Sequence, residues 1–109
     1  MMKDIQFIGR SLEIIRDFPD AAKREAGYQL DRVQHELDPI DWKPMSSIGP
    51  GVREIRIKHE GQYRVIYIAK FEEAIYVLHA FQKKTQKTSK QDIDAAKRAL
   101  KTLQERETV

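Results

Sequence analysis

The chain has 109 residues and a formal net charge of +3, and both values are ordinary for one domain with a buried core. It contains no cysteine, which excludes a disulfide framework, a thiolate metal site and a cysteine nucleophile. No apolar run approaches the roughly 20 residues that span a bilayer, and the first residues lack the apolar segment of a signal peptide. We therefore expect a single cytoplasmic domain over residues 1–109, with no membrane partner.

The N-terminal part of the chain predicts one strand and two helices. Residues 3–8 alternate between polar and apolar side chains enough to form a short strand. Ser11 can cap a helix, and Phe18 should end it, because the residue before a proline is disfavoured in the helical region. Asp20 can cap a second helix. The apolar residues of that helix recur at helical spacing, at Ala22, Ala26, Leu30, Val33 and Leu37.

The C-terminal part predicts a connection, three strands and a last helix. Residues 38–51 are rich in proline and glycine, and connections of this length are often functional. The three strands should cover residues 52–58, 63–70 and 74–81. In the first of them, Glu54, Arg56 and Lys58 share the exposed face, whereas the other two strands are apolar on both faces and should be central. A capping box of Ser89 and Asp92 opens a helix that ends near residue 104.

The element order β-α-α-β-β-β-α predicts an α+β fold. We expect a small, mainly antiparallel sheet with the helices packed on one face. The opposite face would then be available to bind a ligand.

Positive charge is concentrated in the middle of the chain. Residues 43–90 hold ten Lys and Arg against four Asp and Glu, whereas residues 1–42 hold six against nine. Such a dipolar arrangement orients a partner that bears phosphate groups. Cations also lie at or just beyond the ends of the two apolar strands, and a cation beside a sheet normally holds an anion. The charges therefore favour a polyanion, with RNA as the first candidate, over an uneven solvated surface.

A cluster of cations forms the candidate site: Arg53, Arg56, Arg64, Lys83, Lys84 and Lys87, with Lys58 nearer a turn. Arg56 and Arg64 come from adjacent strands around one turn, so their side chains can be neighbours, and a phosphate would screen their repulsion. Aromatic residues are interleaved with the cations, and Phe81 is the one we expect to stack on a base. The simpler interpretation places the aromatic rings in the core and the cations on the surface.

The three histidines, His35, His59 and His79, show no short ligand spacing, so we expect neither a metal site nor a cofactor. His79 alternates with Val77 and Phe81. It is either a hydrogen-bonded histidine of the core or part of the site, since it lies just before the basic run. No Ser/His/Asp order and no glycine-rich phosphate loop is recognisable.

Several motifs follow one another as they do in a known family: Phe18-Pro19, Ala26-Gly27-Tyr28, Lys43-Pro44-Met45, Gly51 to Arg56, Tyr63 to Tyr67 and Val77 to Thr88. Over nearly its whole length the chain resembles the RelE/ParE superfamily of toxins, in the phage-derived, HigB-like branch of type II toxin–antitoxin systems. The resemblance implies a RelE-like fold and a ribosome-dependent, metal-independent mRNA endoribonuclease that inhibits translation. The implied partners are mRNA on the ribosome and an antitoxin with a helix-turn-helix domain.

The resemblance also implies roles for single residues. Arg64 matches the phosphate-stabilising arginine of the family's central strand, and Arg56 matches the cation on the preceding strand. Lys83 and Lys84 match the basic pair after the last strand. Related toxins carry a Tyr or His near the C-terminus, and the chain has neither after Lys90. Three alternatives then stay open: His79 is the general base, a lysine of lowered pKa is the base, or the site is weak.

The remaining cations, Arg53, Lys58 and Lys87, are expected to bind RNA together with Phe81. Two other functions stay open on the sequence. The chain can be a non-enzymatic inhibitor of a protein target such as DNA gyrase, as ParE-like members are, or a degenerate phage-derived protein that binds nucleic acid without cleavage. The cationic cluster favours RNA cleavage, and the missing C-terminal Tyr or His favours the alternatives.

Overall fold

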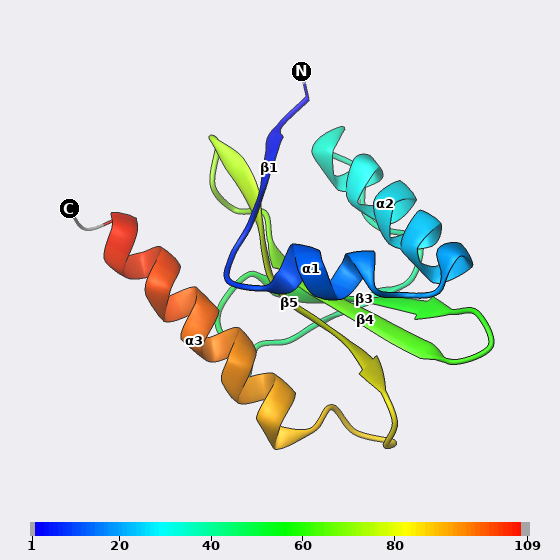
Figure 1. Cartoon of the computed structure of the whole chain (residues 1–109). Helices are drawn as coiled ribbons and strands as arrows, with labels where there is room; N and C mark the ends of the chain where they lie inside the picture. The colour runs from blue at the N-terminus through cyan, green and yellow to red at the C-terminus, as the bar shows by residue number, and fades with distance from the viewer. Residues whose placement is uncertain (1, 108–109) are drawn as a thin grey trace.

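In the computed structural model of the chain, residues 2–107 are described (Figure 1). The elements follow in the order β1 (Asp4–Phe7), α1 (Ser11–Arg16), α2 (Asp20–Gln34), β2 (Trp42–Pro44), β3 (Val52–Lys58), β4 (Gln62–Ile68), β5 (Ala74–Lys83) and α3 (Lys90–Glu107). The predicted order is confirmed, with one strand added. That strand, β2, lies in the segment that the sequence predicted as a plain connection. None of the described helices is long and apolar enough to cross a membrane.

All the strands form one five-stranded sheet in the spatial order β1-β5-β4-β3-β2. Only the β1–β5 pair is parallel, so the predicted mainly antiparallel sheet is confirmed. Strands β4 and β5 each have a neighbour on both sides, as their apolar sequences predicted. A bulge between Ile66 and Tyr67 shifts the register of this central pair.

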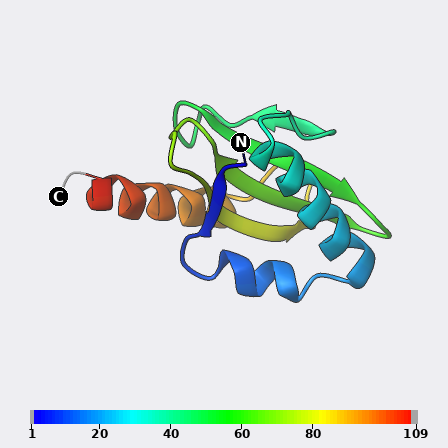
Figure 2. The ribbon, with the colours of Figure 1, turned by 90° about the horizontal axis from the view of Figure 1, so that it is seen from above.

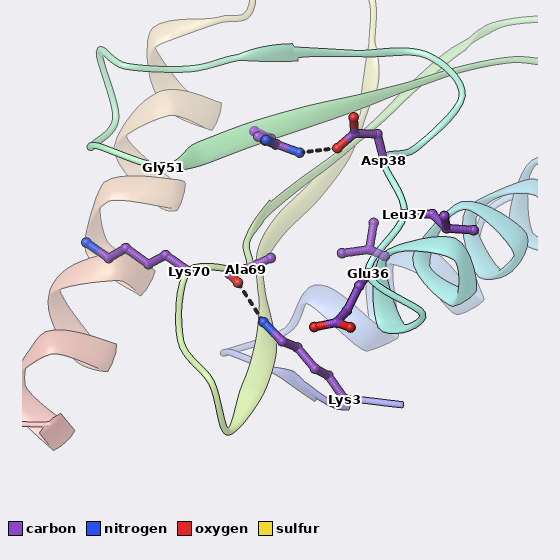
Figure 3. Close-up of a pocket in the computed structure, with 9 residues that line it drawn as sticks. Lys3, Glu36, Leu37, Asp38, Gly51, Ala69 and Lys70 are labelled. Atoms are coloured by element: carbon purple, nitrogen blue, oxygen red, sulfur yellow. Dashed lines mark hydrogen bonds and ion pairs between the residues drawn. The ribbon is translucent and has the colours of Figure 1, made fainter. Parts of the chain in front are cut away.

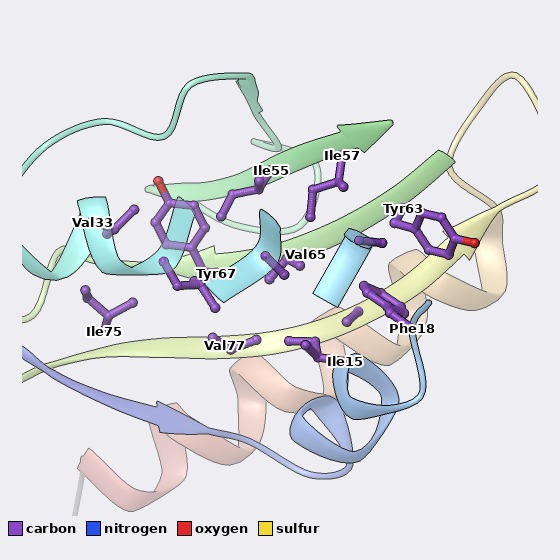
Figure 4. Packing of buried hydrophobic residues seen from close by; sticks show 14 residues of the cluster. Ile15, Phe18, Val33, Ile55, Ile57, Tyr63, Val65, Tyr67, Ile75 and Val77 are labelled. Carbon is purple, nitrogen blue, oxygen red and sulfur yellow. The ribbon is translucent and has the colours of Figure 1, made fainter. Parts of the chain in front are cut away.

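One face of the sheet packs against α1 and α2. Alternate residues of each strand face this side, because successive side chains of a strand point in opposite directions. Figure 4 shows the resulting core, in which the buried residues include Ile15, Phe18, Val33, Ile55, Val65, Tyr67 and Val77. This core anchors the strands that carry the candidate site.

The expectation that the helices pack on one face is wrong for α3. Its Ala96, Leu100 and Leu103 are buried in a second cluster on the opposite face, which we call the α3 face. Figures 1 and 2 show α1 and α2 together, with α3 apart from them and extending beyond the sheet. The reason is that the central strands are apolar on both sides and each side needs a cover. Gly49 allows close packing here, since a Cβ at this position would lie 2.6 Å from Leu100 Cδ2.

The helix starts were predicted with mixed success. Ser11 does not cap α1: it is the first helical residue, and its buried hydroxyl donates to the Val77 carbonyl at 3.2 Å. Asp20 likewise is the first residue of α2 and makes no side-chain cap. The capping box at α3 is confirmed, because the Asp92 amide donates to Ser89 Oγ at 3.1 Å and Ser89 Oγ donates to Asp92 Oδ2 at 2.7 Å.

Candidate functional site

Strand pairing gathers most of the predicted site on the α3 face. Two rows of cross-strand partners run over β3, β4 and β5: Arg56–Arg64–Phe81 and Lys58–Gln62–Lys83. Paired residues share a face of a sheet. The rows therefore place Arg56, Arg64 and Lys83 side by side near the β3–β4 turn. Beyond them, a cleft of about 420 Å³ is lined by Gln62, Arg64, Lys83, Lys84, Thr85 and Gln86, and we call it the cationic cleft.

Arg64 contributes to the cationic cleft although the residue is only 5% exposed. Its Nη1 donates to the Tyr63 carbonyl at 3.0 Å, and its Nη2 donates to Gln62 Oε1 at 3.2 Å. Burial lowers the pKa of Arg64, and the Glu54 carboxylate opposes that effect. An arginine has five N–H donors, so within residues 2–107 these two bonds leave others for a ligand. The two hydrogen bonds thus hold the guanidinium in place and leave some of its N–H donors available.

A buried carboxylate lies behind Arg64. Glu54 is 0% exposed, and its Oε1 lies 3.5 Å from Arg64 Nε and 3.8 Å from Lys43 Nζ. Its Oε2 accepts a hydrogen bond from Thr88 Oγ1 at 3.0 Å. The sequence had placed Glu54 on an exposed face and did not single out Lys43 or Thr88. One signal was present: Glu54 is the single acidic residue among the alternating cations of its strand.

Lys83 and Lys84 lie at the rim of the cationic cleft. Lys83 is half-buried, and burial together with the neighbouring Arg64 and Lys43 lowers its pKa. Lys84, the next residue, is exposed. The pair thus offers one amine that loses its proton more readily than usual and one solvated cation.

Arg56 is the neighbour of Arg64 across the strands, as predicted. Its guanidinium is already paired, because its Nη2 lies 2.8 Å from Asp41 Oδ1 and its Nε donates to the same oxygen at 2.9 Å. The repulsion between the two arginines is therefore reduced by a carboxylate of the segment before β2. Asp41 was another residue that the sequence did not connect with the site.

His79 lies outside the cationic cleft. Its Nε2 is 2.8 Å from Asp92 Oδ1, and its ring stacks on Phe81 with centroids 5.5 Å apart. These contacts match the interpretation of a hydrogen-bonded histidine next to the core. Phe81 itself is 7% exposed and belongs to the cluster under α3, so the structure does not present its ring as a platform for a base.

Three predicted RNA contacts, Arg53, Lys58 and Lys87, are not among the residues that line the cationic cleft. Lys58 is exposed at the end of β3, and Lys87 is exposed in the segment between β5 and α3. Arg53 lies on the opposite face, with its guanidinium 4.0 Å above the Trp42 ring and 2.9 Å from Asp38 Oδ1. The structure therefore does not bring Arg53 to the other cations.

A second hollow, of about 320 Å³, lies beside Arg53 and Asp38 (Figure 3). Two of the cations that line it are engaged: Lys3 Nζ donates to the carbonyls of Ala69 and Phe71 at 3.1 Å, and Arg53 is paired with Asp38. Across the described part of the chain, no group of three or more His, Asp and Glu side chains is arranged to hold a metal ion. The cationic cleft is therefore the candidate site that the geometry favours.

Comparison with protein families matches residues 13–101 to the family described as "Phage derived protein Gp49-like (DUF891)". The chain belongs to this family. Gp49-like proteins are a RelE/HigB-like toxin family, so the resemblance to RelE-superfamily toxins is confirmed. No curated protein matches the chain significantly.

Solved structures support the same fold for this Gp49-like chain. The E. coli toxin RelE, in a double arginine-to-alanine mutant in the free state, matches with a TM-score of 0.63 at 16% identity. The match covers 94% of this chain and 99% of that chain. The RelE-like fold is therefore confirmed. Membership of the Gp49-like family makes this chain a toxin of a toxin–antitoxin system, with an antitoxin as its partner.

Proposed function

We propose that this Gp49-like toxin is an mRNA endoribonuclease that cleaves messages on the ribosome without a metal ion. In such a reaction the ribose 2′-oxygen forms a bond to the adjacent phosphorus, and the bond from phosphorus to the 5′-oxygen breaks. A base removes the 2′-proton, an acid protonates the 5′-oxygen, and cations stabilise the crowded phosphorane.

The observation that carries the proposal is the position of Arg64. A guanidinium held by two hydrogen bonds, with further donors available, suits a phosphate whose charge grows in the transition state. Lys84 adds a solvated cation at the rim of the same cleft. Arg56 adds a third positive charge beside Arg64, and its ion pair with Asp41 partly neutralises that charge.

Lys83 is the better candidate for the base among the two alternatives. Its lowered pKa brings it closer to the pH at which an amine can accept a proton. His79 is less suited, because its Nε2 is engaged with Asp92 and it does not line the cleft. Lys83 would take the proton of the 2′-hydroxyl.

The remaining partners follow from this assignment. Lys58 and Lys87 would contact the RNA backbone beyond the cleft, because both are exposed cations and each adjoins a lining residue: Lys58 pairs with Gln62, and Lys87 follows Gln86. The antitoxin would contain a helix-turn-helix domain, and the toxin would act in the cytoplasm as one domain over residues 1–109.

Primer extension on a translated message tests the proposal. Induction of the protein should produce new 5′ ends within the reading frame, and purified protein should cut the message only when ribosomes are present. An Arg64→Gln variant, compared at equal concentration of folded protein, is the control and should produce none. Intact messages with inhibited DNA supercoiling would support the gyrase alternative. Intact messages with RNA binding would support a protein that has lost cleavage.

A further inference from the structure

Glu54 is a charged residue at a buried position, where an apolar side chain would cost less free energy to bury. Its carboxylate is 0% exposed, and its cross-strand partner on β4 is Ile66, a residue of the apolar cluster under α3. Replacing a buried ion pair by apolar residues of similar size is often neutral or stabilising. The retention of a carboxylate here therefore calls for a role other than stability.

The two oxygens of Glu54 serve different parts of the molecule. Oε1 faces the cations of Arg64 and Lys43, and Oε2 receives the hydroxyl of Thr88. Thr88 lies 34 positions further along the chain, in the segment over residues 84–89 that joins β5 to α3. This segment begins with Lys84 and Thr85, which line the cationic cleft. One carboxylate thus contacts both the arginine of the cleft and the segment that borders it.

The contact with Arg64 is an ion pair and not a hydrogen bond. Arg64 Nε and Glu54 Oε1 lie 3.5 Å apart, and both atoms are buried without a hydrogen-bond partner in the described part of the chain. Charge attraction at this distance holds the Nε side of the guanidinium, while the Nη atoms keep donors for a ligand. Glu54 therefore holds Arg64 through Nε, and the Nη atoms are the ones left to contact a ligand in the cleft.

We propose that Glu54 is a positioning residue of the cationic cleft, which orients the Arg64 guanidinium and, through Thr88, holds residues 84–89 at the cleft. The effect of Glu54 on cleavage rests on the proposed endoribonuclease function. Its effect on anion binding does not, because any phosphate that enters the cleft contacts the same Arg64.

Inorganic phosphate is a probe that tests this assignment without any cleavage. The Arg64 Nε–Hε resonance is followed by NMR during a phosphate titration of the whole chain and of a Glu54→Gln variant. A carboxylate that only neutralises charge makes phosphate bind more tightly when it is removed, since the net charge rises by one. A positioning carboxylate makes phosphate bind several-fold more weakly in spite of the added positive charge. Tighter or unchanged binding in a folded Glu54→Gln protein overturns the proposal.

The conservative variant Glu54→Asp gives an intermediate expectation. It keeps the charge but is one methylene shorter, so it cannot reach Arg64 and Thr88 at once in the observed geometry. Phosphate affinity should fall between those of the original chain and Glu54→Gln. A Glu54→Asp protein that binds phosphate as tightly as the original chain would show that the two contacts do not matter and would contradict the proposal.

Thr88→Val tests the second contact without disturbing the buried ion pair. It removes the hydroxyl at nearly constant shape, so amide hydrogen exchange over residues 84–89 should accelerate and phosphate should bind more weakly. Thr102→Val is the matched control, because within residues 2–107 the Thr102 hydroxyl donates to the Arg98 carbonyl of its own helix. If Thr88→Val, like the control, leaves exchange and phosphate binding unchanged, Thr88 does not transmit a positioning role. The proposal then fails even if Glu54→Gln does not fold.

Cleavage assays then separate this inference from the proposed function. If the protein cleaves RNA, displacement of Arg64 by about 1 Å should lower kcat by about 100-fold and leave KM nearly unchanged. If the original chain does not cleave RNA but Glu54→Gln weakens phosphate binding, the function proposed above is wrong and the role of Glu54 stands. If the original chain cleaves RNA and Glu54→Gln cleaves it equally well, the role of Glu54 is wrong and the function stands.

Discussion

His79 Nε2 lies 2.8 Å from Asp92 Oδ1, and this contact joins the central strand β5 to the first turn of α3. Asp92 also closes the capping box with Ser89 through its other oxygen. The two contacts fix the end of the segment over residues 84–89, whose beginning borders the cationic cleft. His79 therefore supports the cleft through the fold and does not line it.

We expect His79→Ala to lower stability much more than activity. Asp92 loses its imidazole partner and Phe81 loses the stacked ring, so the free energy of unfolding should fall by about 1–3 kcal/mol. Urea denaturation measures this loss, and cleavage is then corrected for the folded fraction. Loss of cleavage at unchanged stability would instead make His79 the general base.

Lys83 should give the cleft a characteristic dependence on pH. Burial first, and then the cations Arg64 and Lys43, lower its pKa, so the folded chain holds this proton less tightly than the unfolded chain does. Between the folded and the unfolded pKa the unfolded chain binds more protons, and stability should therefore rise with pH through that window. NMR titration of Lys83 Nζ should give a midpoint below that of a free lysine. The midpoint should move upward in an Arg64→Gln variant.

The same lowered pKa predicts the pH profile of cleavage. If Lys83 accepts the 2′-proton, the rate should rise with pH until the Lys83 amine is neutral. Lys83→Arg keeps the charge but stays protonated, so this rise should disappear. Lys97→Arg, an exposed change on α3, is the control and should leave the profile intact. A profile that is unchanged in Lys83→Arg would remove Lys83 as the base.

The periodicity of the strands allowed much of this arrangement to be predicted. It placed Arg56 and Arg64 as neighbours on adjacent strands, and the observed register pairs them. The same period of two puts Arg53 and Arg56 on opposite faces, so the exclusion of Arg53 from the site could have been predicted as well. The apolar stripe of α3 does not show which face of the sheet it covers, but the two-sided apolar character of β4 and β5 already indicated that a helix had to cover each face.

Residues of the site that were missed depend on contacts between distant segments. Glu54 is buried, and one of its hydrogen bonds comes from Thr88, 34 positions away. Asp41 reaches Arg56 because the short strand β2 adds to the sheet next to β3. Three residues of mixed character, Trp42 to Pro44, carry too little pattern to predict such a strand. The local sequence therefore specified the strands, and long-range pairing decided which charges meet.

Arg53 and Arg56 form a matched pair that tests which face binds RNA. Both side chains are paired with an aspartate and are similarly exposed, at 37% and 40%, but they lie on opposite faces of β3. We expect Arg56→Ala to weaken RNA binding. The slope of the logarithm of the affinity against the logarithm of the salt concentration should fall by the amount that corresponds to about one phosphate contact. Arg53→Ala should leave both unchanged, because its guanidinium packs on Trp42. Binding to a ribosome-bound message at several salt concentrations measures the difference, and equal effects would contradict the assignment of the α3 face.

Arg64 and Glu54 should be coupled in stability as well as in position. Substitution of one of the two residues leaves its buried partner without the nearest opposite charge. Arg64→Gln and Glu54→Gln should therefore each lower the free energy of unfolding by about 3–5 kcal/mol. The double variant has neither charge, and it should lose less than the sum of the two by about 0.5–3 kcal/mol. Urea denaturation of the four proteins completes the cycle. Additive losses would show that the 3.5 Å ion pair contributes nothing and that Lys43 is the main partner of Glu54.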